Sequence, residues 1–318
     1  MAESNKPKIP IICVVGPTAS GKTALSIAIA KKYNAEIVSC DSMQIYKDMC
    51  IGTAKPTAEE MQGVPHHLID FLPLDENFSV AQYVKLATEA INDIQSRGKN
   101  VVVVGGTGLY FSSLIDNLDF NENDSDPALR AELELLAAQR GGEYLLDMLR
   151  EFDPEIAEKL HPNNVGRIIR AIEVCKTTGS TMTEQQRLAR EKESPFDPVI
   201  IGLDFSDRQK LYDRVNLRVD LMLSQGLMDE NRRLLDTKLS KTAFQAIGFK
   251  EFLPHLTGTA SLEECAENLK MQTRRYAKRQ LTWFRRDERI NWIHPDDLDG
   301  FGQVFELACD ILDSSKKF

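Results

Sequence analysis

A glycine-rich segment near the N-terminus has the residue types and spacing that bind phosphate: Gly16-Pro17-Thr18-Ala19-Ser20-Gly21-Lys22-Thr23. It follows an apolar run at 11–15 and precedes a helical pattern at 24–32. A strand before such a loop and a helix after it direct backbone N–H groups at one anion. Lys22 adds a positive charge, and the Thr23 hydroxyl suits the Mg²⁺ that accompanies a di- or triphosphate. The segment predicts a phosphate cradle rather than a turn that binds nothing, and pyrophosphate on any leaving group would satisfy it as well as ATP.

Two more chemically able side chains follow predicted strands. Asp41 ends the strand pattern at 35–40, and Thr107 follows the β-branched run at 101–104 within Gly-Gly-Thr-Gly. A carboxylate beside a phosphate site either ligates Mg²⁺ or accepts a proton from the attacking group; an ordinary Asp-Ser turn is the alternative. P-loop proteins that hydrolyse ATP usually carry an acid where Thr107 stands. The glycines there permit a ligand to approach the backbone closely, or they form a simple turn.

Basic residues gather in two predicted helices. Arg214 and Arg218 lie four residues apart on one face of a helix at 207–225, where two cations repel unless an anion joins them. An exposed, ion-paired face is the alternative. Between 270 and 289 there are eight Lys or Arg, interleaved with aromatic residues, although the whole chain has a net charge of -9. This block predicts a local phosphate-binding face for nucleic acid, with a solvated helix face as the alternative.

The order of predicted elements indicates an α/β fold of the P-loop NTPase type, with a parallel sheet core and an inserted all-helical domain. Strand patterns recur at 11–15, 35–40, 101–104, 199–203 and 290–293. Residues 118–199 show only helical patterns, with a capped start at Asp126-Pro127. We therefore predict a core of residues 1–117 and 200–318 and a helical insertion of residues 118–199.

Composition narrows the class of protein. The chain has 318 residues, of which 42% are hydrophobic, and its six cysteines are scattered without a C-x-x-C pair. Disulfides and a structural zinc are not expected. The N-terminal residues are polar, and no run approaches ~20 apolar residues, so neither export nor membrane spanning is supported. We expect a cytoplasmic protein that acts as a monomer.

Seven blocks in order resemble the bacterial tRNA dimethylallyltransferase family, also called tRNA isopentenyltransferases. The resemblance covers about residues 9 to 294. The blocks are the loop at 16–23, Asp41-Ser42-Met43-Gln44-Ile45-Tyr46, Ile51-Gly52-Thr53-Ala54-Lys55-Pro56, Pro65-His66-His67-Leu68, Gly105-Gly106-Thr107-Gly108-Leu109-Tyr110, His161-Pro162-Asn163-Asn164 with Arg167 and Arg170, and the segment 275–285. The loop alone is weak, but the ordered set is specific.

The resemblance implies transfer of a dimethylallyl group from dimethylallyl diphosphate to N6 of adenosine 37 in tRNA, just 3′ of the anticodon. It makes Asp41 the general base, places Thr107 at the reacting groups and brings Arg218 to the diphosphate. The loop residues Gly16 to Thr23 would hold the diphosphate, with Mg²⁺ on Thr23 as the implied cofactor.

The resemblance also implies a set of tRNA contacts. The residues are Asp41, Ser42, Met43, Gln44, Thr107, Arg130, Gly166, Arg167, Ile168, Ile169, Arg170, Ala246, Ile247, Gly248, Phe249, Lys250 and Glu251, and the basic helix adds Lys278 and Arg279. This chain departs from the family pattern at two places. Many relatives have Gln where Gly166 stands, and Cys-x-Gly-Tyr-Arg where this chain has residues 246–250.

Three other functions remain open from the sequence. A P-loop kinase of a small alcohol would use Asp41 as its base, but the missing acid after 101–104 and the basic helix disfavour it. An adenylate isopentenyltransferase would act on free AMP, and the insertion and the basic helix disfavour that. A nucleotide sensor would have no use for a base and a hydroxyl at the cradle.

Overall fold

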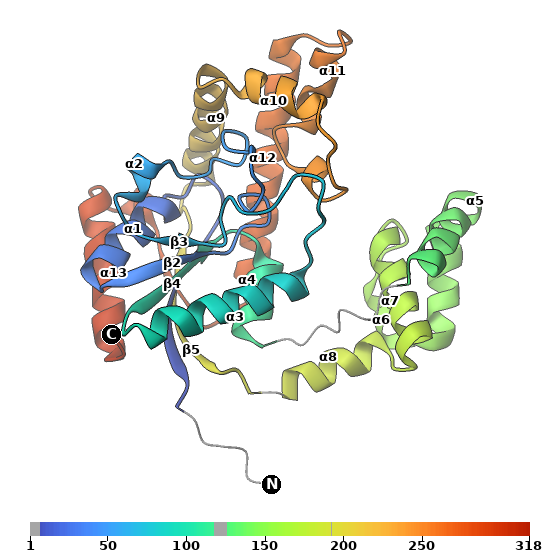
Figure 1. The fold of residues 1–318 in the computed structure, drawn as a ribbon, viewed down its shortest axis with the longest axis horizontal. Helices are drawn as coiled ribbons and strands as arrows, with labels where there is room; N and C mark the ends of the chain where they lie inside the picture. The colour runs from blue at the N-terminus through green and yellow to red at the C-terminus, as the bar shows by residue number, and fades with distance from the viewer. Residues whose placement is uncertain (1–6, 118–125, 192) are drawn as a thin grey trace. The chain divides into compact units, whose positions relative to one another are not determined.

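The computed structural model describes residues 7–117, 126–191 and 193–318 of the chain (Figure 1). They divide into two compact units, one formed by Met1–Ile115 with Pro195–Phe318 and the other by Asp116–Ser194. The predicted first residue of the insertion, 118, lies outside the described residues. In the described ranges, no helix has the length and apolar composition needed to cross a membrane.

The larger unit is built on one sheet in which every strand pair is parallel. The strands are β1 (Ile9–Val15), β2 (Ala35–Ser39), β3 (His66–His67), β4 (Asn100–Gly105), β5 (Phe196–Leu203) and β6 (Ile290–Ile293). Their order across the sheet is β3-β2-β4-β1-β5-β6. The parallel sheet confirms the predicted α/β class, and the short edge strand β3 was not predicted because two residues carry no alternating pattern.

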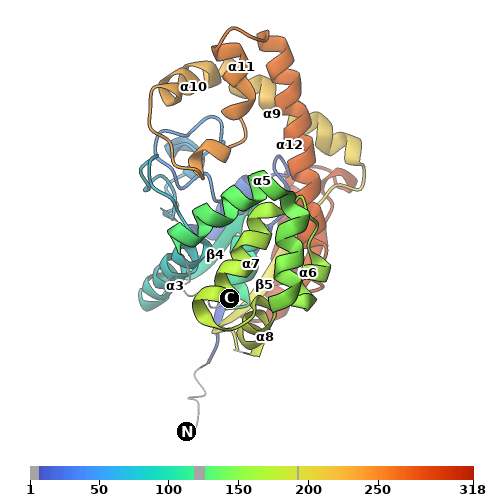
Figure 2. The ribbon, with the colours of Figure 1, turned by 90° about the vertical axis from the view of Figure 1, so that its right-hand side faces the viewer.

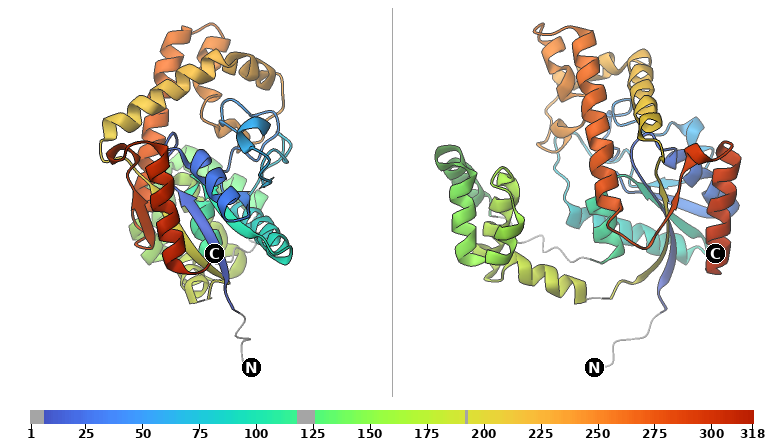
Figure 3. Two further views of the ribbon diagram at one scale, coloured as in Figure 1. Left: turned by 90° about the vertical axis from the view of Figure 1, so that its left-hand side faces the viewer. Right: turned by 180° about the vertical axis from the view of Figure 1, so that it is seen from behind.

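Helices cover both faces of this sheet, which explains why its central strands read as unbroken apolar runs. On one face Ile12 and Val14 of β1 pack in a cluster with α1 (Lys22–Lys32) and α13 (Phe301–Ser315). Figure 3 shows these two helices beside the sheet. On the other face Ile11, Cys13 and Val15 pack with α3 (Val80–Ser96) and α4 (Gly108–Ile115).

Strand β5 begins at Phe196, three residues before the predicted start of the strand, so residues 196–199 belong to the sheet and not to the insertion. The sequence misled because Pro198 lies inside the strand, where it cannot donate a ladder hydrogen bond. Residues 196–202 pair with β1, but β6 pairs only with Ile200–Leu203 on the other side. Pro198 therefore lies where one edge of β5 has no neighbouring strand and a proline is tolerated.

The carboxyl edge of the sheet gathers the loops that carry the predicted site. Helix α1 leaves β1 toward one face, whereas α4 leaves β4 toward the other. Because β1 and β4 are neighbours, their following loops part at this edge and leave a crevice between them. The phosphate loop follows β1, and Thr107 follows β4.

A second group of helices extends from this edge (Figure 2). It comprises α9 (Arg208–Ser224), α10 (Leu227–Leu235), α11 (Leu253–Leu256) and α12 (Leu262–Phe284), with 3₁₀ turns at Ala243–Gln245 and Lys250–Phe252. Val219, Leu227 and Leu269 share an apolar cluster there, while Phe284 at the other end of α12 packs in the core of the sheet. The predicted capping box Ser261–Glu264 starts α12. Helix α12 thus spans from the outer cluster to the sheet.

Two short helices complete the larger unit, α2 (Ala58–Met61) and a 3₁₀ turn at Pro295–Asp297. The smaller unit contains α5 (Pro127–Phe152), α6 (Pro154–Lys159), α7 (Val165–Thr178) and α8 (Met182–Glu191). Its core includes Leu133, Leu145 and Ile172. Helix α5 is interrupted at Gly141, whose φ of 84° and ψ of 167° are not helical, at the predicted helix end.

Candidate active site

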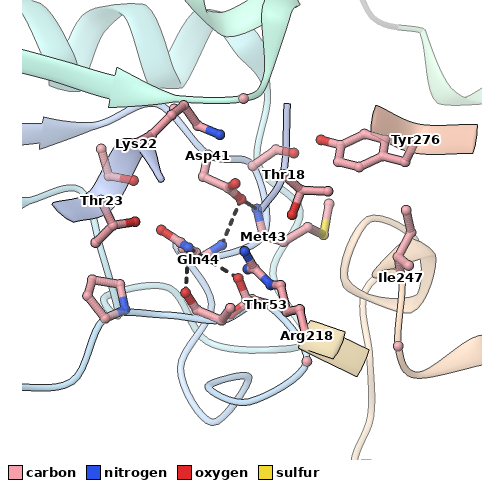
Figure 4. Close-up of a pocket in the computed structure, with 18 of the residues that line it drawn as sticks. Thr18, Lys22, Thr23, Asp41, Met43, Gln44, Thr53, Arg218, Ile247 and Tyr276 are labelled. Atoms are coloured by element: carbon pink, nitrogen blue, oxygen red, sulfur yellow. Dashed lines mark hydrogen bonds between the residues drawn. The ribbon is translucent and has the colours of Figure 1, made fainter. Parts of the chain in front are cut away.

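A cavity of about 230 Å³ opens at the carboxyl edge of the sheet, within the larger unit (Figure 4). The phosphate loop contributes Thr18, Lys22 and Thr23 to its lining. Other lining residues that carry the argument are Asp41, Met43, Gln44, Thr53, Gly106, Arg218, Ile247, Gly248, Tyr276 and Gln280. A larger hollow of about 1300 Å³ lies against the phosphate loop and shares Lys22, Thr23 and Arg218 with the cavity. The loop is therefore reached from two hollows.

The phosphate loop has the shape of an anion cradle. Its last residues form the N-terminal end of α1, and the left-handed backbone of Gly21 (φ 98°) begins that helix. The Lys22 ammonium donates to the Pro17 carbonyl at 2.5 Å and so folds back over the loop. The Ser20 hydroxyl is buried with no hydrogen-bond partner among the described residues. The loop thus offers a helix N-terminus, a cation and an unsatisfied hydroxyl, which suit a phosphate group.

Two cations converge beside the loop. Figure 4 shows Lys22 and Arg218 pointing into the cavity with Asp41. Burial and, to a smaller extent, the Arg218 charge lower the pKa of Lys22, Asp41 opposes both effects, and the pKa is about 7 as a result. Burial likewise lowers the pKa of Arg218, although Asp41 raises it. Two partly desolvated cations opposed by one carboxylate make a site that a diphosphate would stabilise.

Asp41 uses one carboxylate oxygen for the backbone. Its Oδ1 accepts hydrogen bonds from the N–H groups of Met43 at 2.8 Å and Gln44 at 3.2 Å, so the turn interpretation is correct for this oxygen. Within the described part of the chain, no group donates a hydrogen bond to Oδ2. The carboxylate lines the cavity. Asp41 is thus anchored through Oδ1, and Oδ2 is left without a hydrogen-bond donor among the described residues.

Thr107 supports the Asp41 turn. Its Oγ1 accepts from the Ser42 N–H at 3.1 Å, and its own N–H donates to the Cys40 carbonyl at 3.3 Å. Burial raises the pKa of Tyr276 and Asp41 raises it further, whereas a hydrogen bond with Thr107 lowers it. Figure 4 shows the Tyr276 ring pointing into the cavity. Thr107 therefore joins the Asp41 turn to α12 from beside the cavity.

The glycines before Thr107 line the cavity and also make room for protein atoms. A Cβ on Gly105 would lie 2.0 Å from the Cys40 carbonyl oxygen, and one on Gly106 would lie 2.1 Å from the Gln280 amide nitrogen. Neither position has space for a side chain, because Cys40, the residue after β2, and Gln280 of α12 already occupy it.

Buried hydrogen bonds fix the loop at residues 50–54 as one wall of the cavity. Glu230 of α10 is buried, and its carboxylate accepts from the N–H groups of Cys50, Ile51 and Gly52 at 2.8, 2.8 and 2.9 Å. The Gln44 amide donates to the carbonyls of Thr53 and Ala54 at 3.1 and 3.0 Å. Gln44, a predicted tRNA contact, therefore uses its amide nitrogen to hold this wall.

The segment 246–251 forms the opposite wall. Ile247 and Gly248 line the cavity. The Gly248 carbonyl accepts from the Asn231 amide at 2.8 Å, and its N–H donates to the Glu251 carboxylate at 2.9 Å. Since Asn231 follows Glu230 in α10, one turn of buried helix holds both walls.

Five predicted tRNA contacts have side chains that the structure buries. They are Ile168, Ile169, Ala246, Phe249 and Glu251, with exposed fractions between 0% and 5%. Ile168 and Ile169 lie in the apolar core of the smaller unit, and Ala246 and Phe249 lie in the core of the larger one. Packing takes these side chains out of solvent, so a contact of these residues with tRNA would have to use their backbone, and the contact itself stays a prediction.

The remaining predicted tRNA contacts lie in both units. Gly166 and Arg167 are exposed in the first turn of α7. The Arg130 guanidinium forms a two-pronged ion pair with the buried Glu173 carboxylate. Arg170 and Lys250 are half-buried, and the Lys250 ammonium lies 3.3 Å from the Gln245 side-chain oxygen. In the smaller unit, Arg167 is thus exposed to solvent, whereas the Arg130 guanidinium is already paired with a carboxylate.

The basic face of α12 lies close to the cavity. Lys278 and Arg279 are exposed, and the Arg279 guanidinium lies over the Tyr276 ring at 5.6 Å from its centre. Because Tyr276 lines the cavity, one turn of helix joins it to the exposed basic residues.

The two arginines of α9 have different environments. Arg214 donates through Nε to the Ala19 carbonyl of the phosphate loop at 2.8 Å and lies over the Phe205 ring at 5.6 Å. Arg218 lines both hollows. Arg214 thus braces the loop, and Arg218 is the arginine of the pair that lines the cavity.

The oxygen atoms near the loop fit a magnesium ion better than a transition metal. Thr23 is exposed at the start of α1, and its hydroxyl and the Asp41 carboxylate are hard oxygen donors. Among the described residues, no group of three or more His, Cys, Asp or Glu side chains could hold a metal ion. A magnesium ion here would therefore have few protein ligands, and phosphate oxygens and water would supply the others.

Two buried polar residues of the site were not predicted from the sequence, Gln280 and Glu230. The signal that could have found them is a polar residue at a position where the helical spacing places buried apolar residues. Gln280 falls on the same face of α12 as the buried Leu269, Ala277 and Phe284, where a polar side chain needs a partner. The sequence does not say which distant backbone groups those partners are.

Comparisons with known proteins agree with this architecture. The family model described as IPP transferase matches residues 44–287. The chain is 52% identical to a tRNA dimethylallyltransferase from Bacillus licheniformis over 91% of this chain and 92% of that protein. A tRNA dimethylallyltransferase from Caldanaerobacter subterraneus is 45% identical over 98% and 99% of the two chains.

Solved structures give the same result. A tRNA isopentenylpyrophosphate transferase from Bacillus halodurans superimposes with a TM-score of 0.71 at 43% identity, covering 97% of this chain and 99% of that one. A eukaryotic dimethylallyltransferase acting on tRNA has a TM-score of 0.75 at 35% identity, covering 87% and 70%. The parallel sheet and the cavity at its carboxyl edge define an α/β fold with a P-loop-like core. The chain belongs to the IPP transferase family.

Proposed function

We propose that this protein transfers a dimethylallyl group from dimethylallyl diphosphate to N6 of adenosine 37 in tRNA, and that it does so as a cytoplasmic monomer. The observation that carries the proposal is the shared cavity of Asp41, Lys22 and Arg218. A proton acceptor there faces the same space as a cradle for a diphosphate leaving group. The names of the relatives supply the transferred dimethylallyl group and the tRNA acceptor.

In the proposed reaction the N6 nitrogen of adenine attacks C1 of the dimethylallyl group. The N6–C1 bond forms as the bond from C1 to the diphosphate oxygen breaks, and pyrophosphate leaves. The N6 proton passes to Oδ2 of Asp41, while Oδ1 stays bound to the backbone and keeps the carboxylate in place. An exocyclic adenine amine is a poor nucleophile unless its proton is removed, so this carboxylate accelerates bond formation.

Negative charge develops on the departing pyrophosphate, and the cations beside the loop are placed to stabilise it. Lys22 and Arg218 reach the cavity from two different helices, α1 and α9. A charge held in a partly desolvated site stabilises a developing anion more strongly than the same charge in water. When bound on Thr23, Mg²⁺ adds charge neutralisation of the leaving group.

The walls of the cavity suit a base that has left its stack. Met43, Ile247 and Tyr276 give it apolar and aromatic surface, and Figure 4 shows these side chains around one space. A base in an anticodon loop must be extruded to reach Asp41, at a cost of about a few kcal/mol. Phosphate contacts from the basic face of α12 can offset that cost.

Labelled dimethylallyl diphosphate tests the proposal against its rivals. We expect label to appear in unmodified tRNA that carries adenosine at position 37, and not in free AMP. Label transferred to AMP but not to tRNA would support an adenylate isopentenyltransferase. Phosphate transfer from ATP to a small alcohol, with no prenyl transfer, would support a kinase.

A further inference from the structure

Gln280 is a polar side chain in the interior of the larger unit. It lies near the C-terminal end of α12 and is 6% exposed. Its Oε1 accepts a hydrogen bond from the Thr18 backbone N–H at 2.9 Å, and its Nε2 donates to the Gly106 carbonyl at 2.9 Å. One amide therefore joins the phosphate loop after β1 to the glycine segment after β4.

The backbone around Gln280 is shaped to receive it. A Cβ on Gly106 would lie 2.1 Å from the Gln280 Nε2, and the nearest atom outside Gln280 would be the Gly16 carbonyl oxygen at 3.5 Å. The space beside Gly106 is thus closed by Gln280 alone. The glycine and the glutamine form one fitted unit, and an alanine at 106 would displace the amide.

The position of the contact on the loop gives it a function. Thr18 lines the cavity, and the rest of the loop, through Thr23, follows it directly. Because the Thr18 N–H is held by Gln280, the front of the loop is fixed before a ligand arrives. A cradle whose N–H groups are already aligned binds an anion without first losing loop entropy.

Gln280 also follows directly on the exposed residues Lys278 and Arg279 of the same helix. The helix face that the proposed function assigns to tRNA and the loop that it assigns to diphosphate are therefore joined through one side chain.

We propose that Gln280 is a positioning residue that presets the phosphate loop for the diphosphate and fixes it to the tRNA-binding face of α12. The proposal rests on the proposed function for its two ligands. Gln280 acts through the backbone of Thr18, whose N–H its side chain holds.

The test measures binding of inorganic pyrophosphate with Mg²⁺ by calorimetry, and binding of unmodified tRNA by filter retention, with the full chain. For Gln280→Ala and Gly106→Ala we expect pyrophosphate affinity to fall about tenfold, as for the loss of one hydrogen bond to a fixed loop. The affinity of both variants for tRNA should stay within about twofold of that of the wild-type protein. Their loss in kcat/KM for dimethylallyl diphosphate should come from a higher KM.

The double variant gives the sharpest prediction. Once Gln280 is alanine, the added Cβ at 106 has space, so Gln280→Ala with Gly106→Ala should bind pyrophosphate no worse than either single variant. Gln209→Ala removes an exposed glutamine side chain of α9 whose amide donates to Asp213, and Gly302→Ala adds a Cβ in open space. Both controls should bind pyrophosphate normally.

Three results would overturn the proposal: normal pyrophosphate binding by both single variants, effects that multiply to about a hundredfold in the double variant, or parallel losses of pyrophosphate and tRNA binding. Gln280→Met, which keeps the length of the side chain without its hydrogen bonds, replaces Gln280→Ala if that variant does not fold. Loss of folding in every Gln280 variant would also contradict a role specific to the loop. If the wild-type protein fails to prenylate tRNA while the variants show these losses of pyrophosphate binding, the proposed function fails and the positioning role stands.

Discussion

Replacing Asp41 by asparagine should leave the protein folded and able to bind diphosphate but should slow the chemical step. Asparagine keeps an acceptor oxygen at the Oδ1 position, where the N–H groups of Met43 and Gln44 lie at 2.8 and 3.2 Å. It replaces Oδ2 by an amide group that cannot accept the N6 proton. The turn is thus preserved while the base is removed.

The expected loss of rate follows from the role of a general base. Such a group contributes roughly 10²–10⁴-fold, or about 2.7–5.5 kcal/mol of transition-state stabilisation. Asp41→Ala should lose the same rate and, in addition, about 1–3 kcal/mol of stability, because two backbone N–H groups lose their charged acceptor. The difference between the two variants separates the turn from the chemistry.

The assay is a single-turnover measurement with saturating tRNA and labelled dimethylallyl diphosphate, so that product release does not mask the chemical step. Asp48→Asn is a matched control, because Asp48 is exposed and its left-handed backbone (φ 63°) suits asparagine. The control should react at the normal rate. A near-normal rate for Asp41→Asn, in protein that binds pyrophosphate, would refute Asp41 as the base.

Further predictions concern the charged residues around the cavity. Arg218→Ala should lower kcat/KM for dimethylallyl diphosphate by roughly 10–100-fold with part of the loss in kcat, and Arg214→Ala should cost less; the reverse order in steady-state kinetics would mean that Arg214 is the ligand-facing arginine. Because the pKa of Lys22 is about 7 in the free protein and a bound anion raises it, pyrophosphate binding requires a proton that the free protein loses above pH 7. Titration calorimetry should therefore show the affinity for pyrophosphate falling by up to about tenfold per pH unit above pH 7. The fall is measured relative to Lys22→Arg, whose side chain stays charged. Equal pH dependence in the two proteins would contradict this reasoning. Lys278→Ala and Arg279→Ala should each reduce the slope of log affinity for tRNA against log salt by about one without changing the modified base, and an unchanged slope would remove that residue from the phosphate contacts.

The parts of the site that were predictable from the sequence are those encoded over short distances. The phosphate loop needs a strand, eight residues and a helix in succession, so its spacing alone predicts its shape. Asp41 and Thr107 follow strand patterns whose carboxyl ends must meet in a parallel sheet. The strand at Phe196 was missed at its start because the tolerance for Pro198 depends on where β6 stops pairing, which is not visible locally.

Other parts depend on contacts between distant segments. Gln280 meets Thr18 across 262 residues, and Glu230 meets Cys50 across 180. A single sequence shows that such polar residues fall at buried helical positions but not what satisfies them. The burial of Ile168 and Ile169, by contrast, follows from the helical spacing of apolar residues in α7. These residues were assigned to tRNA contact from the resemblance to a family and not from that spacing.

The most direct test of the central claim is to identify the product. Unmodified tRNA carrying adenosine 37 would be incubated with the protein, Mg²⁺ and dimethylallyl diphosphate, then digested and mapped by mass spectrometry. The account predicts one dimethylallyl group on N6 of adenosine 37, released pyrophosphate in equal amount, and no product with guanosine at position 37. A prenyl group at any other nucleotide, or none on tRNA with an active diphosphate site, would contradict it.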